Sequence, residues 1–277
     1  MTETQYEVLA VRYAHVERRS PQNFIGGDSH DVPMPMDYAV WVIRGDLGTV
    51  VVDTGFDQLE AELRGRTLVT PVDEALHAVG VDHEAVTDVI ITHLHYDHAG
   101  NTDLFPNARF HLQEREMRYA TGPAMTHRAC AAAFSPDNVA TMVRRVFDRR
   151  VRFHDGYAHP FPGIELHHVG GHTMGLQVVR VQTARGPILL ASDACHYYAN
   201  YSQRRAFPEV YNVAELMSAY DRFLELVDDD DHVVPGHDPR VFADYPQPSP
   251  GAARLDLPPE RPATQPVRTG CNDDNSR

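Results

Sequence analysis

Three histidines and an aspartate lie within six positions in the segment HLHYDH, residues 93–98. Imidazole nitrogens and carboxylate oxygens are the ligands that zinc and related divalent cations take in proteins. Because side chains alternate faces along a strand, His93, His95, Asp97 and His98 cannot all point one way within a strand. The segment directly follows the apolar run VTDVIIT. We therefore expect a loop at the end of a buried strand, with ligands for more than one metal.

Three further side chains of the same types come at the ends of later apolar runs: His172, Asp193 and His237, in GGHT, SDA and PGHD. A glycine or small residue beside each of them lets the backbone turn sharply. Because open sheets place their sites at the carboxyl ends of strands, we expect all seven groups at one edge. Seven ligands exceed what one tetrahedral ion uses, which predicts two divalent metals. Two such cations can share and activate a water, and this is the chemistry of hydrolysis.

Short apolar runs in both halves of the chain would carry these ligands, and helix signals separate them. The expected strands are 38–45, 48–55, 86–93, 163–171, 176–183, 187–194 and 231–237. Thr70 can cap an expected helix over 70–80, and Asn212 with Glu215 has capping-box spacing at the start of another. Residues 127–150 are rich in Met, Phe and Ala, which fits either a lid or a helix pair packed on the sheet.

Charge and composition argue against several kinds of partner. The 277 residues are 42% hydrophobic, which suits one main domain, and the net charge is −14 with every basic residue an arginine. An acidic chain without a basic patch repels phosphate backbones and anionic membrane surfaces, so we expect neither nucleic acid nor a membrane as partner. Scattered cysteines, a polar N-terminus and the lack of an apolar run of about 18 residues predict a cytoplasmic protein.

The composition of the sequence changes near its C-terminus. Residues 1–245 contain the apolar periodicity and the ligand-type side chains, whereas residues 246–277 are dense in Pro and polar residues. A segment of the latter kind buries too little apolar surface to offset the entropy of ordering. We therefore expect one folded domain over 1–245 and a flexible Pro-rich tail over 246–277.

Other polar clusters are weaker candidates for a metal site. His167 and His168 are adjacent in an expected strand and face opposite ways, so they cannot chelate one ion together. The segment GGDSHD at 26–31 has the composition of a turn, and DDDD at 228–231 lacks the Gly and Glu positions of a calcium loop. We interpret all of these as structural or solvent-exposed.

Taken together, HLHYDH, GGHT, SDA and PGHD, in this order and spacing, resemble the metallo-β-lactamase fold superfamily over residues 35–245. The resemblance implies an α/β fold, an αββα sandwich of two mixed β-sheets flanked by helices, and makes residues 1–245 a hydrolase domain. Asp53 matches the aspartate that supports the hexapeptide loop in this family. The implied ligands are His93, His95 and His172 for one metal and Asp97, His98 and His237 for the other, with Asp193 bridging both.

Within the superfamily the chain is most similar to the N-acyl-homoserine lactone lactonase branch, which acts in quorum quenching. That resemblance implies a dinuclear metal-dependent hydrolase that opens a lactone or ester of a small-molecule substrate, with Asp97 passing a proton to the leaving oxygen. Zinc is the expected metal, with iron, manganese or cobalt as alternatives. Besides the small-molecule substrate, a second copy of the chain in a homodimer is the other partner considered. The candidates for an apolar groove, with core packing as the alternative for each, are Phe134, Met125, Met142 and Phe147.

The sequence departs from the lactonase pattern just after Asp193. Those lactonases place a substrate-contacting Tyr three residues after the bridging Asp, whereas SDACHYY has His196 there and Tyr197 next. We therefore expect His196, or else Tyr197, to donate a hydrogen bond to the substrate. Thioester or aryl ester hydrolysis of the glyoxalase II type is the alternative in the same fold. A phosphodiesterase would need a basic surface, and a non-catalytic metal-binding protein would be expected to have lost ligands.

Overall fold

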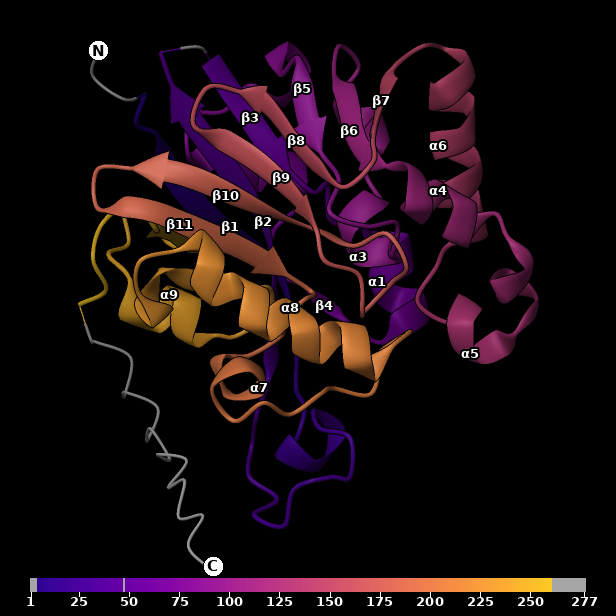
Figure 1. Ribbon diagram of the computed structural model, residues 1–277. Coiled ribbons are helices and arrows are strands. Elements are labelled where there is room, and N and C mark those ends of the chain that lie inside the picture. Colours follow the sequence, from indigo (N-terminus) through magenta and orange to yellow (C-terminus); the bar gives the residue numbers. More distant parts are fainter. Residues whose placement is uncertain (1–3, 47, 261–277) are drawn as a thin grey trace, which may run out of the picture.

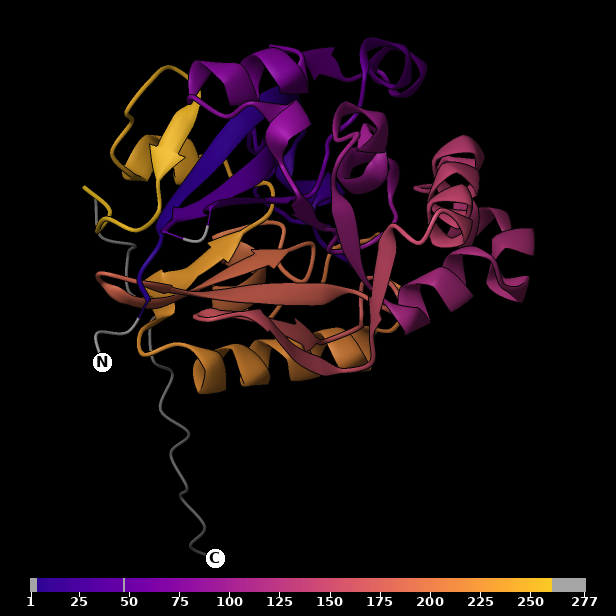
Figure 2. The same ribbon diagram turned by 90° about the horizontal axis from the view of Figure 1, so that it is seen from above.

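The computed structural model describes residues 4–46 and 48–260. Two β-sheets face each other, and helices cover their outer faces (Figure 1). Seen from above, the layers separate clearly, with the long helix α8 outside one sheet and α2 outside the other (Figure 2). The expected αββα sandwich of two mixed sheets is confirmed.

The first sheet has eight strands in the described part of the chain, in the order β13-β1-β2-β3-β5-β6-β7, with β4 pairing on β1. The pairs from β1 to β3 are antiparallel, whereas β3, β5, β6 and β7 run parallel. The strands are β1 Glu7–Val16, β2 Met36–Gly45, β3 Gly48–Val52, β4 Thr67–Leu68, β5 Asp88–Ile90, β6 Arg109–Gln113, β7 Val151–His154 and β13 Ala252–Arg254.

The second sheet has the order β12-β11-β10-β9-β8. Its pairs are antiparallel except for β11 and β12, which run parallel and so bring the ends of both strands to the same edge. The strands are β8 Tyr157–Phe161, β9 Ile164–His168, β10 Gln177–Thr183, β11 Gly186–Ser192 and β12 Val233–Pro235.

The helices begin at positions that polar side chains and prolines favour. The Asn212 side chain caps α8 by accepting from the N–H groups of Ala214 and Glu215, at 3.0 and 3.3 Å, as expected. Thr70 does not cap α2, because the N-cap position is Pro71. Nowhere in the described ranges is a helix long and apolar enough to cross a membrane. The α-helices are α1 Gln58–Arg64, α2 Val72–Ala78, α3 Tyr96–Ala99, α4 Glu114–Ala120, α5 Arg128–Ala131, α6 Pro136–Phe147, α7 Tyr198–Ser202, α8 Val213–Leu226 and α9 Arg240–Asp244.

Three hydrophobic cores lie between the four layers. Adjacent strand residues point to opposite faces, so Val178 packs with α8 while Val179 packs between the two sheets. Leu189 and Leu190 divide in the same way on β11. Because both faces of these strands are buried, their sequences are continuous apolar runs, which explains why they could be recognised.

The predicted domain boundary at residue 245 is wrong. Ala252–Arg254 forms β13, which pairs antiparallel with β1, and the next residue, Leu255, is fully buried. The Asp256 carboxylate accepts a hydrogen bond from the N–H of Val8 at 3.2 Å. Pairing with β1 supplies hydrogen bonds and apolar contacts that stabilise this segment, and its composition alone does not predict them. The rest of the expected tail, 261–277, lies outside the described residues.

Candidate metal centre and active site

The expected ligands all follow strands that end at one edge of the two sheets. His93 and His95 follow β5, and α3, which starts at Tyr96, carries the other two ligands of the hexapeptide. The later ligands, His172, Asp193 and His237, follow β9, β11 and β12. The structure brings all seven side chains together in two groups that share Asp193.

The first group consists of three histidines and Asp193. His93 Nε2 lies 3.0 Å from His95 Nδ1, and His172 Nε2 lies 2.9 Å from His95 Nδ1 and 3.2 Å from His93 Nε2. Asp193 Oδ2 approaches His172 Nε2 at 3.3 Å. A tetrahedral ion about 2.0–2.1 Å from each nitrogen would separate the nitrogens by roughly 3.3 Å, so the spacing fits a metal.

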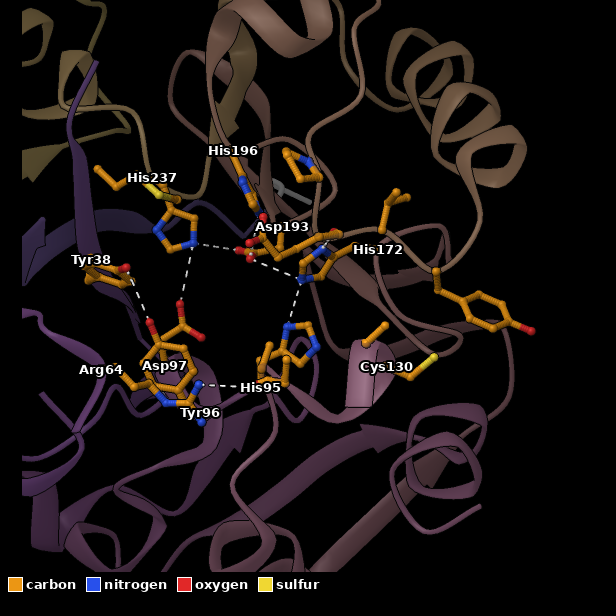
Figure 3. Close-up of a pocket in the computed structure, with 18 of the residues that line it drawn as sticks. Tyr38, Arg64, His95, Tyr96, Asp97, Cys130, His172, Asp193, His196 and His237 are labelled. Atoms are coloured by element: carbon orange, nitrogen blue, oxygen red, sulfur yellow. Dashed lines mark hydrogen bonds and ion pairs between the residues drawn. The ribbon is translucent and has the colours of Figure 1, made fainter. Parts of the chain in front are cut away.

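The second group is built on the other oxygen of Asp193. Asp193 Oδ1 lies 3.1 Å from His98 Nε2 and 3.0 Å from His237 Nε2. Asp97 Oδ2 lies 3.6 Å from His98 Nε2 and 3.8 Å from His237 Nε2. Figure 3 shows Asp97, His237 and Asp193 converging on one point, with His172 and His95 on the other side of Asp193.

Burial and charge in these groups suit divalent cations. His98 Nε2 and Asp193 Oδ1 are buried, and although they lie 3.1 Å apart, neither makes a hydrogen bond of good geometry within the described residues. Burial lowers the pKa of His93 and His95 well below 6.5, so both are neutral at pH 7, the form that binds a cation. Burial opposes ionisation of Asp193, but His237 and His98 hold its pKa well below 3.8. Burial opposes protonation of His98 and His237, but the Asp193 carboxylate raises the pKa of both above 6.5, so these two imidazoles would release a proton when a cation binds. Once neutral, imidazoles beside an ionised carboxylate are the donor set that a divalent ion takes.

Asp53 supports the hexapeptide loop from β3, as expected. Its Oδ2 accepts from His98 Nδ1 at 2.7 Å and from Thr92 Oγ1 at 2.8 Å, while Oδ1 accepts from the N–H of Thr92 at 2.7 Å. Asp53 has a φ of 63°, and Ser192, whose hydroxyl lies 2.9 Å from that of Thr92, has a φ of 46°. Two non-glycine residues with positive φ on facing sheets indicate backbone strain beside the metal groups.

Glu116 was missed by the sequence analysis, although it joins two ligand loops. Its carboxylate is fully buried on α4 and accepts from the N–H of Leu94 at 2.9 Å, from Thr173 Oγ1 at 2.7 Å and from the N–H of Gly175 at 3.0 Å. A Cβ on Gly175 would lie 2.0 Å from the Glu116 nitrogen, so only glycine fits there. In the sequence Glu116 is one of several helix glutamates, and no motif marks it.

Backbone carbonyls orient two ligand histidines through the ring nitrogen that faces away from the metal groups. His172 Nδ1 donates to the carbonyl oxygen of Glu209 at 2.6 Å, and His237 Nδ1 donates to that of Asp37 at 2.9 Å. Such bonds fix the tautomer that leaves Nε2 free to bind a metal.

A cavity of about 510 Å³ opens above the metal groups. Segments far apart in the sequence form its wall, including α5 and the loops around residues 18, 66 and 210. Within the 127–150 region, residues of and after α5 line the cavity, whereas Val139 and Met142 of α6 are buried in the core, as for a helix packed on the sheet. A lid stays a prediction. The residues of the wall that are not metal-ligand candidates include Arg18, Met36, Tyr38, Arg64, Arg66, Tyr96, Tyr119, Cys130, His196 and Tyr211.

His196 lines the cavity, whereas Tyr197 does not. His196 Nε2 lies 3.0 Å from Asp193 Oδ2, and its ring stacks on Phe207 with centroids 3.6 Å apart. Tyr197 is buried, and its hydroxyl donates to the carbonyl oxygen of Met34 at 3.3 Å. Of the two residues expected to contact the substrate, only His196 is among the described residues that line the cavity.

The expected apolar groove is not part of this cavity. Met125 and Phe134 line a separate apolar cavity of about 510 Å³ between α4 and α6. Met142 is fully buried in the core, while Phe147 is 83% exposed. Phe134 lines the apolar cavity, and its ring lies 4.5 Å from that of His95, which lines the other cavity. Met142 therefore packs in the core. Phe147 lines no apolar groove and does not pack in the core, because it is exposed to solvent.

Comparisons with known proteins agree with this geometry. A profile of the metallo-beta-lactamase superfamily matches residues 35–237. An N-acyl homoserine lactonase of a Bacillus species is 26% identical over 234 residues, which cover 76% of this chain and 88% of that protein. N-acyl homoserine lactonase AttM of Azorhizobium caulinodans is 29% identical over 245 residues, covering 79% and 87%.

The fold is likewise that of a solved lactonase. The crystal structure of a quorum-quenching N-acyl homoserine lactone lactonase has a TM-score of 0.69 at 20% identity, and the match covers 86% of this chain and 93% of that one. The family profile spans the hexapeptide and every later ligand candidate, from His93 to His237. The chain belongs to the metallo-beta-lactamase superfamily and is a metal-dependent hydrolase.

Proposed function

We propose that this protein is a dinuclear metal-dependent hydrolase that opens a lactone or another carboxylic ester. The observation that carries the proposal is the pair of ligand groups sharing Asp193 at the floor of a cavity large enough for a small molecule. The relatives named N-acyl homoserine lactonase support the reaction class. A cytoplasmic location and a homodimer stay predictions from the sequence.

The two ligand groups would hold two divalent ions, with zinc proposed first because neutral histidine nitrogens and carboxylate oxygens suit it. When bound, such ions lower the pKa of a water and polarise a carbonyl. Asp193 would serve both ions through its two oxygens, and Asp53 would hold His98 in the orientation that presents Nε2. Glu116 keeps the first and second ligand loops at a fixed separation.

Hydrolysis adds one water across the acyl C–O bond. The oxygen of the water bonds to the acyl carbon, the C–O bond to the leaving oxygen breaks, and the leaving oxygen must gain a proton. Asp97 lines the cavity, which supports the proposal that it carries that proton to the leaving oxygen. No serine or cysteine nucleophile is needed for this reaction.

His196 is the residue that we propose contacts the substrate. It stands where the lactonase pattern has a phenol, and a neutral imidazole has one N–H to donate. His196 Nε2 lies 3.0 Å from Asp193 Oδ2, so this N–H would turn to the substrate when a bound metal takes that oxygen. Its ring is held by stacking on Phe207, so it needs little reorganisation to meet a developing negative charge.

A screen of purified protein tests the proposal. Full-length chain loaded with zinc, and separately with manganese or cobalt, is given lactones of varied acyl length, aryl esters and thioesters, and metal content is measured in the same samples. We expect two metals per chain and turnover of at least one ester or lactone that chelator removes. Thioester turnover alone would support the glyoxalase II-type alternative. Two bound metals without any turnover would indicate a binding protein.

A further inference from the structure

The wall of the metal cavity is positively charged, although the chain as a whole has a net charge of −14. Three arginines line the cavity: Arg18, Arg64 and Arg66. Apart from the metal-ligand candidates Asp97 and Asp193, the lining contains one carboxylate, that of the exposed Glu209. In a chain with this excess of acidic groups, a cavity with more cations than free carboxylates calls for a specific explanation.

Arg64 is explained by contacts within the protein. Its guanidinium pairs with Glu60, donates to the carbonyl oxygens of Ala132 at 2.9 Å and Phe134 at 3.3 Å, and stacks 3.9 Å above the ring of Tyr96. These contacts tie α1 to the segment that covers the cavity. Arg64 is therefore a structural residue whose charge is already neutralised.

Arg66 has no comparable partner. Its Nε donates to the Tyr96 hydroxyl at 3.1 Å and its Nη1 to the carbonyl oxygen of Arg64 at 3.0 Å, and neither bond uses Nη2. Among the residues that the structure describes, no carboxylate lies within 4.0 Å of its guanidinium. A guanidinium offers five N–H donors and a full charge, so the protein leaves most of the binding capacity of Arg66 unused.

The backbone presents Arg66 to the cavity in a defined way. Gly65 ends α1 with a φ of 63°, and the N–H of Arg66 then donates back to the carbonyl oxygen of Ala61 at 2.8 Å. This helix end fixes the point from which the side chain leaves the backbone. The guanidinium is thus preorganised, which lowers the entropy that binding a ligand would cost.

Two phenols connect Arg66 with the metal groups. The hydroxyl of Tyr96 lies 3.4 Å from that of Tyr38, and the Tyr38 ring lies 5.0 Å from the ring of His237 (Figure 3). Arg66 and the metal-ligand candidates line the same cavity, so one small-molecule substrate can contact both.

Arg18 is the second cation of the wall without a carboxylate partner. It donates to the carbonyl oxygen of Gln22 at 2.8 Å, and within the described ranges no acidic side chain lies within 4.0 Å of it. We propose that Arg66, assisted by Arg18, binds an anionic group of the substrate, a carboxylate or a phosphate, while the bond to be hydrolysed lies over the metal centre. This inference rests on the proposed function and names its substrate class. Charge-assisted bonds from a guanidinium to such an anion are among the stronger hydrogen bonds in proteins.

Three esters that differ only at the far end of the acyl chain test this substrate class. They are the 4-nitrophenyl monoester of glutaric acid, its terminal amide, and the analogue with a terminal phosphonate. For the zinc-loaded full chain we expect a kcat/KM about ten- to a hundredfold higher for a charged ester than for the amide, mostly through KM. The better of the two charged esters identifies the anion as carboxylate or phosphate. Equal kcat/KM for all three esters would overturn the inference but leave ester hydrolysis intact.

The variant Arg66→Gln assigns the effect to this residue. We expect it to lower kcat/KM for the charged ester at least about tenfold more than for the amide, and Arg66→Lys to recover part of the loss. Arg109→Gln, which removes an exposed arginine on β6 outside the cavity, should change neither value. Equal losses for charged and neutral esters in Arg66→Gln would show a structural role and contradict the proposal.

A binding measurement separates this inference from the proposed function. Calorimetric titration of zinc-loaded protein with glutarate should show binding that is stronger than for its monoamide, and Arg66→Gln should remove that difference. This result can be obtained even if no ester is hydrolysed, which would refute the proposed function alone. Identical binding of glutarate and monoamide in the unmodified protein would refute the anion subsite.

Discussion

The floor and the wall of the cavity position their side chains in different ways. The floor consists of seven ligand candidates that follow strand ends, and most of them have a second partner, such as Asp53 for His98 and the Glu209 carbonyl for His172. The wall draws Arg18 and Arg66 from separate loops, with two side-chain hydrogen bonds each. Strand ends are held by the cores on both faces of the sheets, so their geometry varies little. We infer that the floor determines the reaction and the wall determines the substrate.

The largest effect should come from the carboxylate that both ligand groups share. Asp193→Asn keeps the shape but weakens a ligand of each ion, so we expect metal content to fall below two per chain and turnover to fall by about three orders of magnitude. Elemental analysis and ester hydrolysis measure both. Asp88→Asn, which alters a carboxylate bonded to His111 away from the site, is the control. Full metal content with normal turnover in Asp193→Asn would contradict the inference that the floor of the cavity determines the reaction.

A smaller loss is expected at the boundary between floor and wall. His196→Ala removes a donor at the cavity, and turnover should fall by roughly one to three orders of magnitude while both metals stay bound. Tyr197→Phe should have little effect, because the hydroxyl of Tyr197 bonds to the Met34 carbonyl. If the phenylalanine variant loses activity and His196→Ala keeps it, the tyrosine takes the role instead.

Support of the floor can be tested at Glu116. Glu116→Gln places an amide where three donors point, so we expect metal affinity to weaken by about ten- to a hundredfold, as for other groups that orient ligands. Titration with a chelator measures this. Glu114→Gln removes a carboxylate at the start of the same helix and is the matched control. Unchanged affinity would mean that the ligand loops hold their separation without Glu116.

The smallest effect on turnover is expected far from both regions. Truncation after Gln247 removes β13 and the buried Leu255, so we expect the free energy of unfolding to fall by about 2 kcal/mol or more, with turnover at low temperature nearly unchanged. Chemical denaturation measures the loss. For a truncation after Glu260, composition predicts no loss of stability. If the chain truncated after Gln247 had the same free energy of unfolding as the full chain, β13 would contribute little to stability.

Most of the strands that could be recognised in the sequence are buried on both faces. β2, β3, β10 and β11 lie within or close to the expected ranges, and β5, β9 and β12 also lie within expected ranges. The strands β1, β6, β7 and β8 were not predicted, because charged residues and histidines interrupt their apolar runs, as in RFHLQ over Arg109–Gln113. Pairing with neighbours stabilises such segments whatever their own pattern.

The sequence by itself determined the set of ligand candidates at the centre of the site, because metal chemistry demands particular residue types and strand ends demand particular spacings. Tertiary structure alone decided what surrounds that centre. Glu116, Arg66 and Tyr38 come from a helix, a helix end and a strand that no motif connects, and only the fold brings Glu116 to the ligand loops and the other two to the cavity. The ligands lie in short motifs at the ends of strands, and such local patterns can be recognised in a sequence. The cavity wall forms through contacts between residues far apart in the sequence, so no local pattern predicts it.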